Sequence, residues 1–121
     1  MTGENLLSID RTELERRRRL ASLRKTREFE RKKLLARLLR AEIRAVQLRR
    51  WIAKIAGDGE ISENSDLGRL LGWSRAELVS LESSIHPSSI AEALRQSNLF
   101  PEPDELHDPL GDPPPHRPWG R

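Results

Sequence analysis

The chain has 121 residues and no cysteine, and 34% of its residues are charged against 36% that are hydrophobic. Without cysteine it forms no disulfide, thiolate metal site or cysteine nucleophile, and its few large aromatic residues limit the core that it can bury. No apolar run approaches the roughly 18 residues of a membrane span. We therefore expect a small intracellular protein, cytoplasmic or, in a eukaryote or its virus, nuclear.

Charge is distributed unevenly along the sequence. Residues 9–56 contain 17 of the 22 Lys and Arg together with 6 acidic residues, whereas residues 57–121 contain 5 basic and 12 acidic residues. The net charge of +3 therefore hides halves of about +11 and −7. A strongly basic segment of this kind favours a polyanionic partner, and nucleic acid is the most common one.

A flexible leader is expected at residues 1–8, followed by one long Arg-rich helix over residues 9–56. This stretch has no Pro or Gly and consists mainly of strong helix formers. Ser8 or Asp10 could cap the start of the helix. Gly57 is well placed for a left-handed cap at its end.

Apolar residues in the second half of this helix follow a heptad pattern, with spacings of 4, 3, 4, 3, 4 and 3. The pattern predicts a packing seam over residues 34–56 that also serves oligomerisation, as a coiled-coil homodimer. Leu35, Leu39, Ile43 and Val46 widen the stripe, as in a bundle helix. The seam residues are Leu34, Leu38, Ala41, Ala45, Leu48, Ile52 and Ile55.

Basic residues dominate the helix before the seam. Consecutive residues on a helix step by about 100°, so four adjacent arginines present cations on several sides and could reach phosphates on both walls of a groove. A solvated helix held by i,i+4 ion pairs is the alternative, but the acidic residues are too few to neutralise the cations. The predicted nucleic-acid-binding residues are Arg16, Arg17, Arg18, Arg19, Arg24, Lys25, Arg27, Arg31, Lys32 and Lys33.

After a loop at residues 57–65, short helices over residues 66–98 are expected to pack on the long helix. Ser65 or Asp66 could cap the first of them, and the pair Gly72-Trp73 suggests a turn. A capping box, Ser74-Arg-Ala-Glu, would then open another helix.

With this turn, the segment 66–84 resembles the helix–turn–helix core of bacterial DNA-binding proteins. The resemblance implies that the second helix reads bases. That helix carries Arg75 as its cation, however, and the acidic Glu77 and Glu82 beside it repel phosphate. Its leucines therefore favour a hairpin packed on the long helix. Trp51, one position off the seam, could stack on a base or close the edge of this hairpin against Trp73.

A final helix, Ile90 to Ser97, is expected after an interruption at His86-Pro87, with Ser88 or Ser89 as its cap. Residues 99–121 form a Pro-rich acidic tail with seven of the eight prolines, which predicts disorder. The tail could hold a protein partner through Trp119. Alternatively, it could fold back on the basic helix and compete with nucleic acid.

Catalytic chemistry finds little support in the sequence. The three histidines lie in expected turns or in the tail, without metal-ligand spacing, and there is no Gly-rich phosphate loop. We expect no enzymatic activity, cofactor or metal.

The sequence thus predicts an all-α, non-enzymatic nucleic-acid-binding protein with an accessory or regulatory role, acting on DNA or RNA as a homodimer. The alternative is a helical scaffold that docks on an acidic or helical protein. Such a scaffold would lose binding when Leu38, Leu48 or Ile52 becomes polar.

Overall fold

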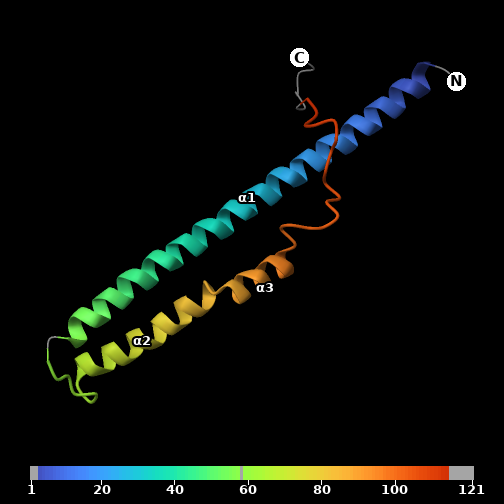
Figure 1. Ribbon diagram of the computed structural model, residues 1–121. Helices are drawn as coiled ribbons and strands as arrows, with labels where there is room; N and C mark the ends of the chain where they lie inside the picture. Colours follow the sequence, from blue (N-terminus) through green and yellow to red (C-terminus); the bar gives the residue numbers. More distant parts are fainter. Residues whose placement is uncertain (1–2, 58, 115–121) are drawn as a thin grey trace. The chain divides into compact units, whose positions relative to one another are not determined.

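The computed structural model describes residues 3–57 and 59–114, except for the side chains of residues 3–9. It contains three helices, α1 (Gly3–Ala56), α2 (Asp66–Ser84) and α3 (Pro87–Ser97), and no strand among the described residues (Figure 1). The all-α prediction, with two shorter helices packing against a long one, is confirmed. The chain divides into two compact units. We call residues 32–98 the hairpin unit, and residues up to 31 together with those from 99 the tail unit.

Helix α1 begins earlier than predicted and ends at Ala56 as predicted, but without the predicted cap. Residues 3–8 are helical, so they are not a leader, and Ser8 and Asp10 lie inside the helix and do not cap it. The sequence from 4 to 8 has no Pro or Gly to stop the helix earlier. At the other end, the Gly57 N–H still donates to the Ala53 carbonyl at 3.0 Å, and φ is positive at Gly59 rather than at Gly57. The predicted left-handed cap at Gly57 is therefore wrong.

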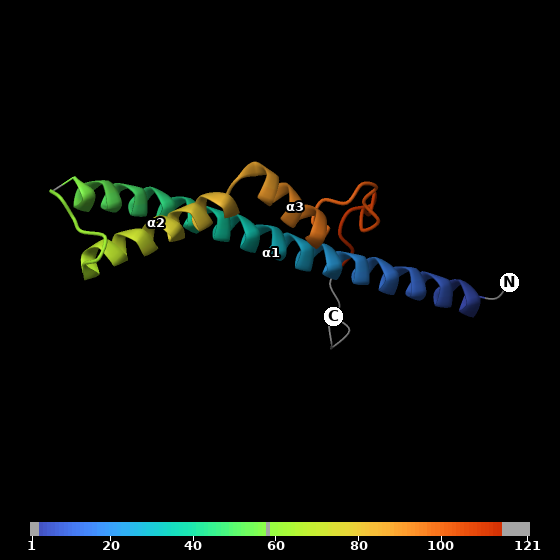
Figure 2. The ribbon, with the colours of Figure 1, turned by 90° about the horizontal axis from the view of Figure 1, so that it is seen from below.

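The hairpin unit buries the predicted seam against α2. Ala45 of α1 and Leu71 and Ser74 of α2 are 1%, 3% and 3% exposed, and the other seam residues are buried or half-buried. The second half of α1 and α2 lie side by side in both ribbon views (Figures 1 and 2). Arg49 and Glu82 join them by an ion pair of 2.7 Å. The residues assigned to oligomerisation thus pack within one chain, and the homodimer stays a prediction.

Helix α2 is continuous, which corrects the predicted turn at Gly72-Trp73. Its start is capped as expected, because the Gly68 N–H donates to the Ser65 hydroxyl at 3.0 Å. The helix then runs through Gly72 to Ser84. A glycine inside a helix costs only about 1 kcal/mol relative to alanine, whereas burying a leucine side chain such as that of Leu71 contributes about 1.5–3 kcal/mol. The helix–turn–helix resemblance therefore fails.

Helix α3 begins at Pro87, three residues before the predicted start. His86 caps it by accepting the Ser88 N–H on Nδ1 at 3.2 Å, so Ser88 and Ser89 are not the cap. Proline suits the first turn of a helix, where its missing N–H has no partner to lose. The predicted interruption at His86-Pro87 separates α2 from α3 as expected. Asn98, in the left-handed conformation with φ 49°, ends α3.

Alanine substitutions at two glycines of α2 test the geometry of this helix. A Cβ at position 68 would lie 2.9 Å from the Glu63 Cα and closer still to the Ser62 carbonyl oxygen, so we expect Gly68→Ala to lower the free energy of unfolding by at least about 1 kcal/mol. A Cβ at position 72 meets nothing within 4 Å. Gly72→Ala should therefore raise that free energy by up to about 1 kcal/mol. Urea unfolding followed by circular dichroism measures both changes. Destabilisation by Gly72→Ala would contradict the continuous helix and support the turn predicted from the sequence.

Candidate nucleic-acid interface

Four arginines of the tail unit occupy the face of α1 that continues the seam. Arg17, Arg24, Arg27 and Arg31 stand at spacings of 7, 3 and 4, and a step of three from Arg31 reaches the first seam residue. Their side chains are 18%, 19%, 13% and 26% exposed, against 55% for Arg16. Arginine thus takes the place that leucine and isoleucine have further along the same face.

The partner of these four arginines is the tail itself. Residues 99–114 form an irregular segment that runs beside the first part of α1 (Figures 1 and 2). Three of its carboxylates pair with the guanidinium groups, and Arg27 holds both oxygens of Asp104, a geometry that strengthens such a pair. The distances are 2.8 Å for Arg17–Asp108, 2.8 Å for Arg24–Asp112, and 2.8 and 3.1 Å for Arg27–Asp104.

Backbone carbonyls of the tail accept further hydrogen bonds from the same side of the helix. Prolines lack an N–H and prevent this segment from forming a helix or strand, so its carbonyls need other donors. The Arg31 guanidinium also lies 4.1 Å from the centre of the Phe100 ring. The bonds are Arg31 to Leu99 (2.9 Å), Arg24 to Leu106 (2.5 Å), Arg17 to Gly111 (3.3 Å) and Arg18 to Pro114 (3.0 Å). We call Arg17, Arg24, Arg27 and Arg31, together with residues 99–114, the arginine clasp.

Two carboxylates of the clasp also order their own turns. Asp104 accepts the Leu106 N–H at 3.0 Å, and Asp108 accepts the Leu110 N–H at 2.9 Å, the local pattern that aspartate favours in turns. The hydrogen bond from Arg27, followed by that from the Leu106 amide, lowers the pKa of Asp104 from 3.8 to about 2. The hydrogen bonds from Arg17 and then from the Leu110 amide lower the pKa of Asp108.

The clasp corrects the prediction of disorder for residues 99–114. Composition describes a segment by itself, and a Pro-rich acidic segment cannot build a core of its own. Here the arginines of α1 supply the opposite charge and the donors, and the Asp108 side chain is only 6% exposed. The rest of the predicted tail, including Trp119, lies outside the described residues.

A second set of cations lies on α1 within the hairpin unit. Lys33, Arg37, Arg40, Arg44, Gln47, Trp51 and Lys54 stand at spacings of 4, 3, 4, 3, 4 and 3, which places them on one side of the helix. All seven are exposed. We call the basic members, Lys33, Arg37, Arg40, Arg44 and Lys54, the basic row. Most of the basic row was not among the predicted residues, because the local density of arginine does not reveal cations that follow the helical period.

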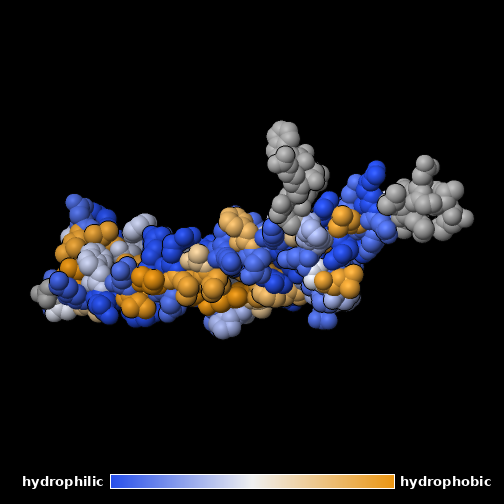
Figure 3. Space-filling model, turned by 90° about the horizontal axis from the view of Figure 1, so that it is seen from above, coloured by the Kyte–Doolittle hydropathy of each residue, from blue (hydrophilic) through white to orange (hydrophobic). Residues whose placement is uncertain are grey.

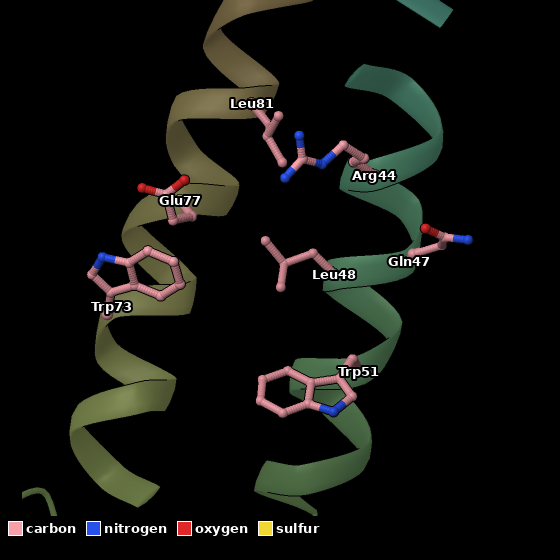
Figure 4. Close-up of a pocket in the computed structure, with 7 residues that line it drawn as sticks. All are labelled: Arg44, Gln47, Leu48, Trp51, Trp73, Glu77 and Leu81. Atoms are coloured by element: carbon pink, nitrogen blue, oxygen red, sulfur yellow. The ribbon is translucent and has the colours of Figure 1, made fainter. Parts of the chain in front are cut away.

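The basic row borders an open groove between α1 and α2. The groove has a volume of about 320 Å³, and Arg44, Trp51 and Trp73 are among its lining residues (Figure 4). The two indoles are 37% and 63% exposed, so their faces are accessible for stacking on a flat ring. Glu77 is the acidic residue of the lining and would repel a phosphate placed at that point.

The ten residues predicted to bind nucleic acid fall into different environments. Arg17, Arg24, Arg27 and Arg31 belong to the clasp, Arg18 bonds the Pro114 carbonyl, and Arg16 pairs with Glu13 at 2.7 Å. Lys33 belongs to the basic row. Of these ten, Arg19, Lys25 and Lys32 are exposed and form no ion pair with the described residues.

No helix within residues 3–57 and 59–114 is long and apolar enough to cross a membrane. Within the same residues, no group of three or more His, Cys, Asp or Glu side chains could hold a metal ion. Comparison with protein-family models, curated proteins and solved structures gave no match to this chain.

The low pKa of Asp104 makes the clasp sensitive to acid. Because this pKa lies below the ordinary 3.8, the carboxylate stabilises the clasp above about pH 4, and this contribution is lost as the pH falls toward 2. We expect ¹³C NMR titration to give a pKa of about 2 for Asp104 and a value nearer 3.8 in Arg27→Gln. Lys25→Gln, which removes an exposed cation of the same helix, is the control and should leave the pKa of Asp104 unchanged. Equal pKa values in the wild type and Arg27→Gln would contradict the ion pair.

Proposed function

We propose that this protein is a non-enzymatic nucleic-acid-binding protein whose open contact surface is the basic row of α1. The observation that supports the proposal is the row itself, which places five cations on one side of a helix. At 1.5 Å per residue, its 21-residue step from Lys33 to Lys54 covers roughly 32 Å. Lys and Arg spaced along such a length neutralise several phosphates and release their counterions, and this release drives binding.

The charge balance of each unit favours the basic row over the clasp as the first contact. Residues 10–31 hold nine basic and five acidic residues, and residues 99–114 add five acidic residues and no Lys or Arg. The described part of the tail unit is therefore close to neutral. Residues 32–56 hold eight basic residues and one acidic residue, and residues 57–98 hold three basic and seven acidic residues, so the hairpin unit keeps a net charge of about +3. An approaching polyanion is attracted most strongly to this second half of α1.

Trp51 adds a contact that a purely cationic surface lacks. It occupies a position in the same helical period as the basic row and lines the groove together with Trp73. Stacking of a base on an aromatic side chain is worth about 1–3 kcal/mol and requires an unpaired base. Single strands would therefore gain more than duplexes from this surface, and phosphate contacts alone would not separate DNA from RNA.

Neutralising the row tests this function. We expect the triple variant Arg37→Gln, Arg40→Gln, Arg44→Gln to bind at least about tenfold more weakly near 50 mM salt, because phosphate contacts are lost. The slope of log affinity against log salt should fall by about 0.9 for each lost contact. Fluorescence anisotropy with labelled single strands, duplex DNA and duplex RNA measures both quantities.

The matched control is Arg69→Gln, Arg75→Gln, Arg95→Gln, which removes the same charge from α2 and α3. It should bind nearly as tightly as the wild type. Equal losses in the two triple variants would show that net charge and not the row governs binding. If the wild type binds none of the three oligonucleotides, the proposed function is refuted.

A second candidate function, a helical interaction protein, is favoured by another side of α1. Leu35, Leu39 and Ile43 of α1 are 56%, 54% and 56% exposed, and Figure 3 shows hydrophobic residues on the surface among the hydrophilic ones. Exposed apolar surface of this kind often marks a protein contact. The seam residues are less suitable probes than expected, because Ile52 is buried and polar changes there would destabilise the hairpin unit.

This apolar side gives the homodimer a direct test. If two copies pair through it, sedimentation velocity should show a dimer for the wild type and a monomer for Leu39→Gln, Ile43→Gln, because the pairing loses apolar area. Val79→Gln is the control, since Val79 is 67% exposed on α2. A wild-type monomer at every concentration examined would remove the homodimer, and a dimer in all three proteins would place the contact elsewhere.

A further inference from the structure

The tail presents the clasp arginines with oxygen atoms that resemble those of a phosphate chain. Arg17, Arg24 and Arg27 each pair with a carboxylate. Arg17 and Arg24 also donate hydrogen bonds to backbone carbonyls. Guanidinium groups bind carboxylates and phosphates with the same paired geometry. A surface built for the first kind of anion therefore fits the second.

Several contacts of the tail are incomplete. The Asp112 carboxylate is 74% exposed and is held through one oxygen by one nitrogen of Arg24. The buried Arg27 Nε–H has no hydrogen-bond partner within the described residues. Asp104 and Asp108 also accept the backbone amides of Leu106 and Leu110, and Asp108 offers Arg17 only one of its oxygens. A phosphate has no backbone amide to satisfy, so it can offer the arginines all of its accepting oxygens.

We propose that Arg17, Arg24 and Arg27 form a second phosphate-binding surface, and that residues 99–114 occupy this surface until a polyanion displaces them. The inference rests on the proposed function for the identity of the ligand and adds its regulation. The tail competes at the high effective concentration of a tethered segment. A short or weakly charged ligand leaves the clasp closed, whereas a long polyanion opens it and gains new contacts.

Neutralising the three paired aspartates of the tail, with the rest of the chain unchanged, tests the competition. We expect Asp104→Asn, Asp108→Asn, Asp112→Asn to bind a single-stranded oligonucleotide at least about tenfold more tightly than the wild type at low salt. The salt slope should steepen by about 0.9 for each added phosphate contact. Adding Arg17→Gln, Arg24→Gln and Arg27→Gln to this variant should abolish the gain.

The matched control is Glu63→Gln, Glu102→Gln, Glu105→Gln, which changes the net charge equally but removes no ion pair of the clasp. The control should change the affinity by less than about threefold, since every ion pair of the clasp stays in place and exposed unpaired carboxylates contribute little. An equal gain in the control would overturn the proposal, because the effect would then come from net charge alone.

A second measurement follows the tail directly. In the ¹⁵N-labelled wild type, the heteronuclear NOE values of the Leu106 and Leu110 amides should fall when the oligonucleotide is added, and should be low without it in the triple Asn variant. Bound wild type with unchanged NOE values would overturn the inference.

The two proposals fail separately. If the wild type binds and the triple Asn variant binds no more tightly, the second surface is refuted and the basic row stands. If the triple Asn variant binds through its clasp arginines while the row variants have no effect, the row is refuted and the second surface stands. If neither the wild type nor the triple Asn variant binds, both are refuted.

Discussion

One face of α1 determines what the rest of the chain can do. Positions at the heptad spacing are the least exposed of the helix from Arg17 to Ile55. Leucine, alanine and isoleucine at these positions bury area against α2, which needs only an apolar surface of matching shape. Arginine at the same positions needs anionic and carbonyl oxygens. The change of residue type between Arg31 and Leu34 therefore separates two kinds of packing on a single helix.

The tail supplies the oxygen atoms that these arginines need, because it cannot form regular structure. Its prolines leave carbonyls without backbone donors, and its aspartates provide carboxylates in turns that they themselves stabilise. Each exposed ion pair contributes little alone. The Arg17–Asp108 pair is mostly shielded from water and is linked to the other pairs through one short segment, so screening by salt weakens it less than an exposed pair.

The parts of the fold that the sequence predicted are those governed by local pattern. The heptad spacing gave the buried face around Ala45 and Ile52, and His86-Pro87 gave the break between α2 and α3. The errors arose where distant partners decided the outcome. Packing overrode the weak helix preference of Gly72, and the arginines of α1 ordered residues 99–114. A composition rule does not register complementary charge located 77 to 91 residues away in the sequence.

The sequence predicted only part of the candidate site, again because distant partners decide the rest. The density of arginine located the clasp residues correctly on α1 but could not show that a segment of the same chain holds them. The basic row needed no distant information, because Arg37, Arg40 and Arg44 follow the helical period in the sequence itself. The two surfaces differ in the charge that faces them. The exposed basic row attracts any approaching anion. The covered clasp arginines can bind only a ligand that displaces the carboxylates and carbonyls that they now contact. If both proposals hold, a ligand would bind weakly through the row and more strongly once its phosphates exchange with Asp104, Asp108 and Asp112.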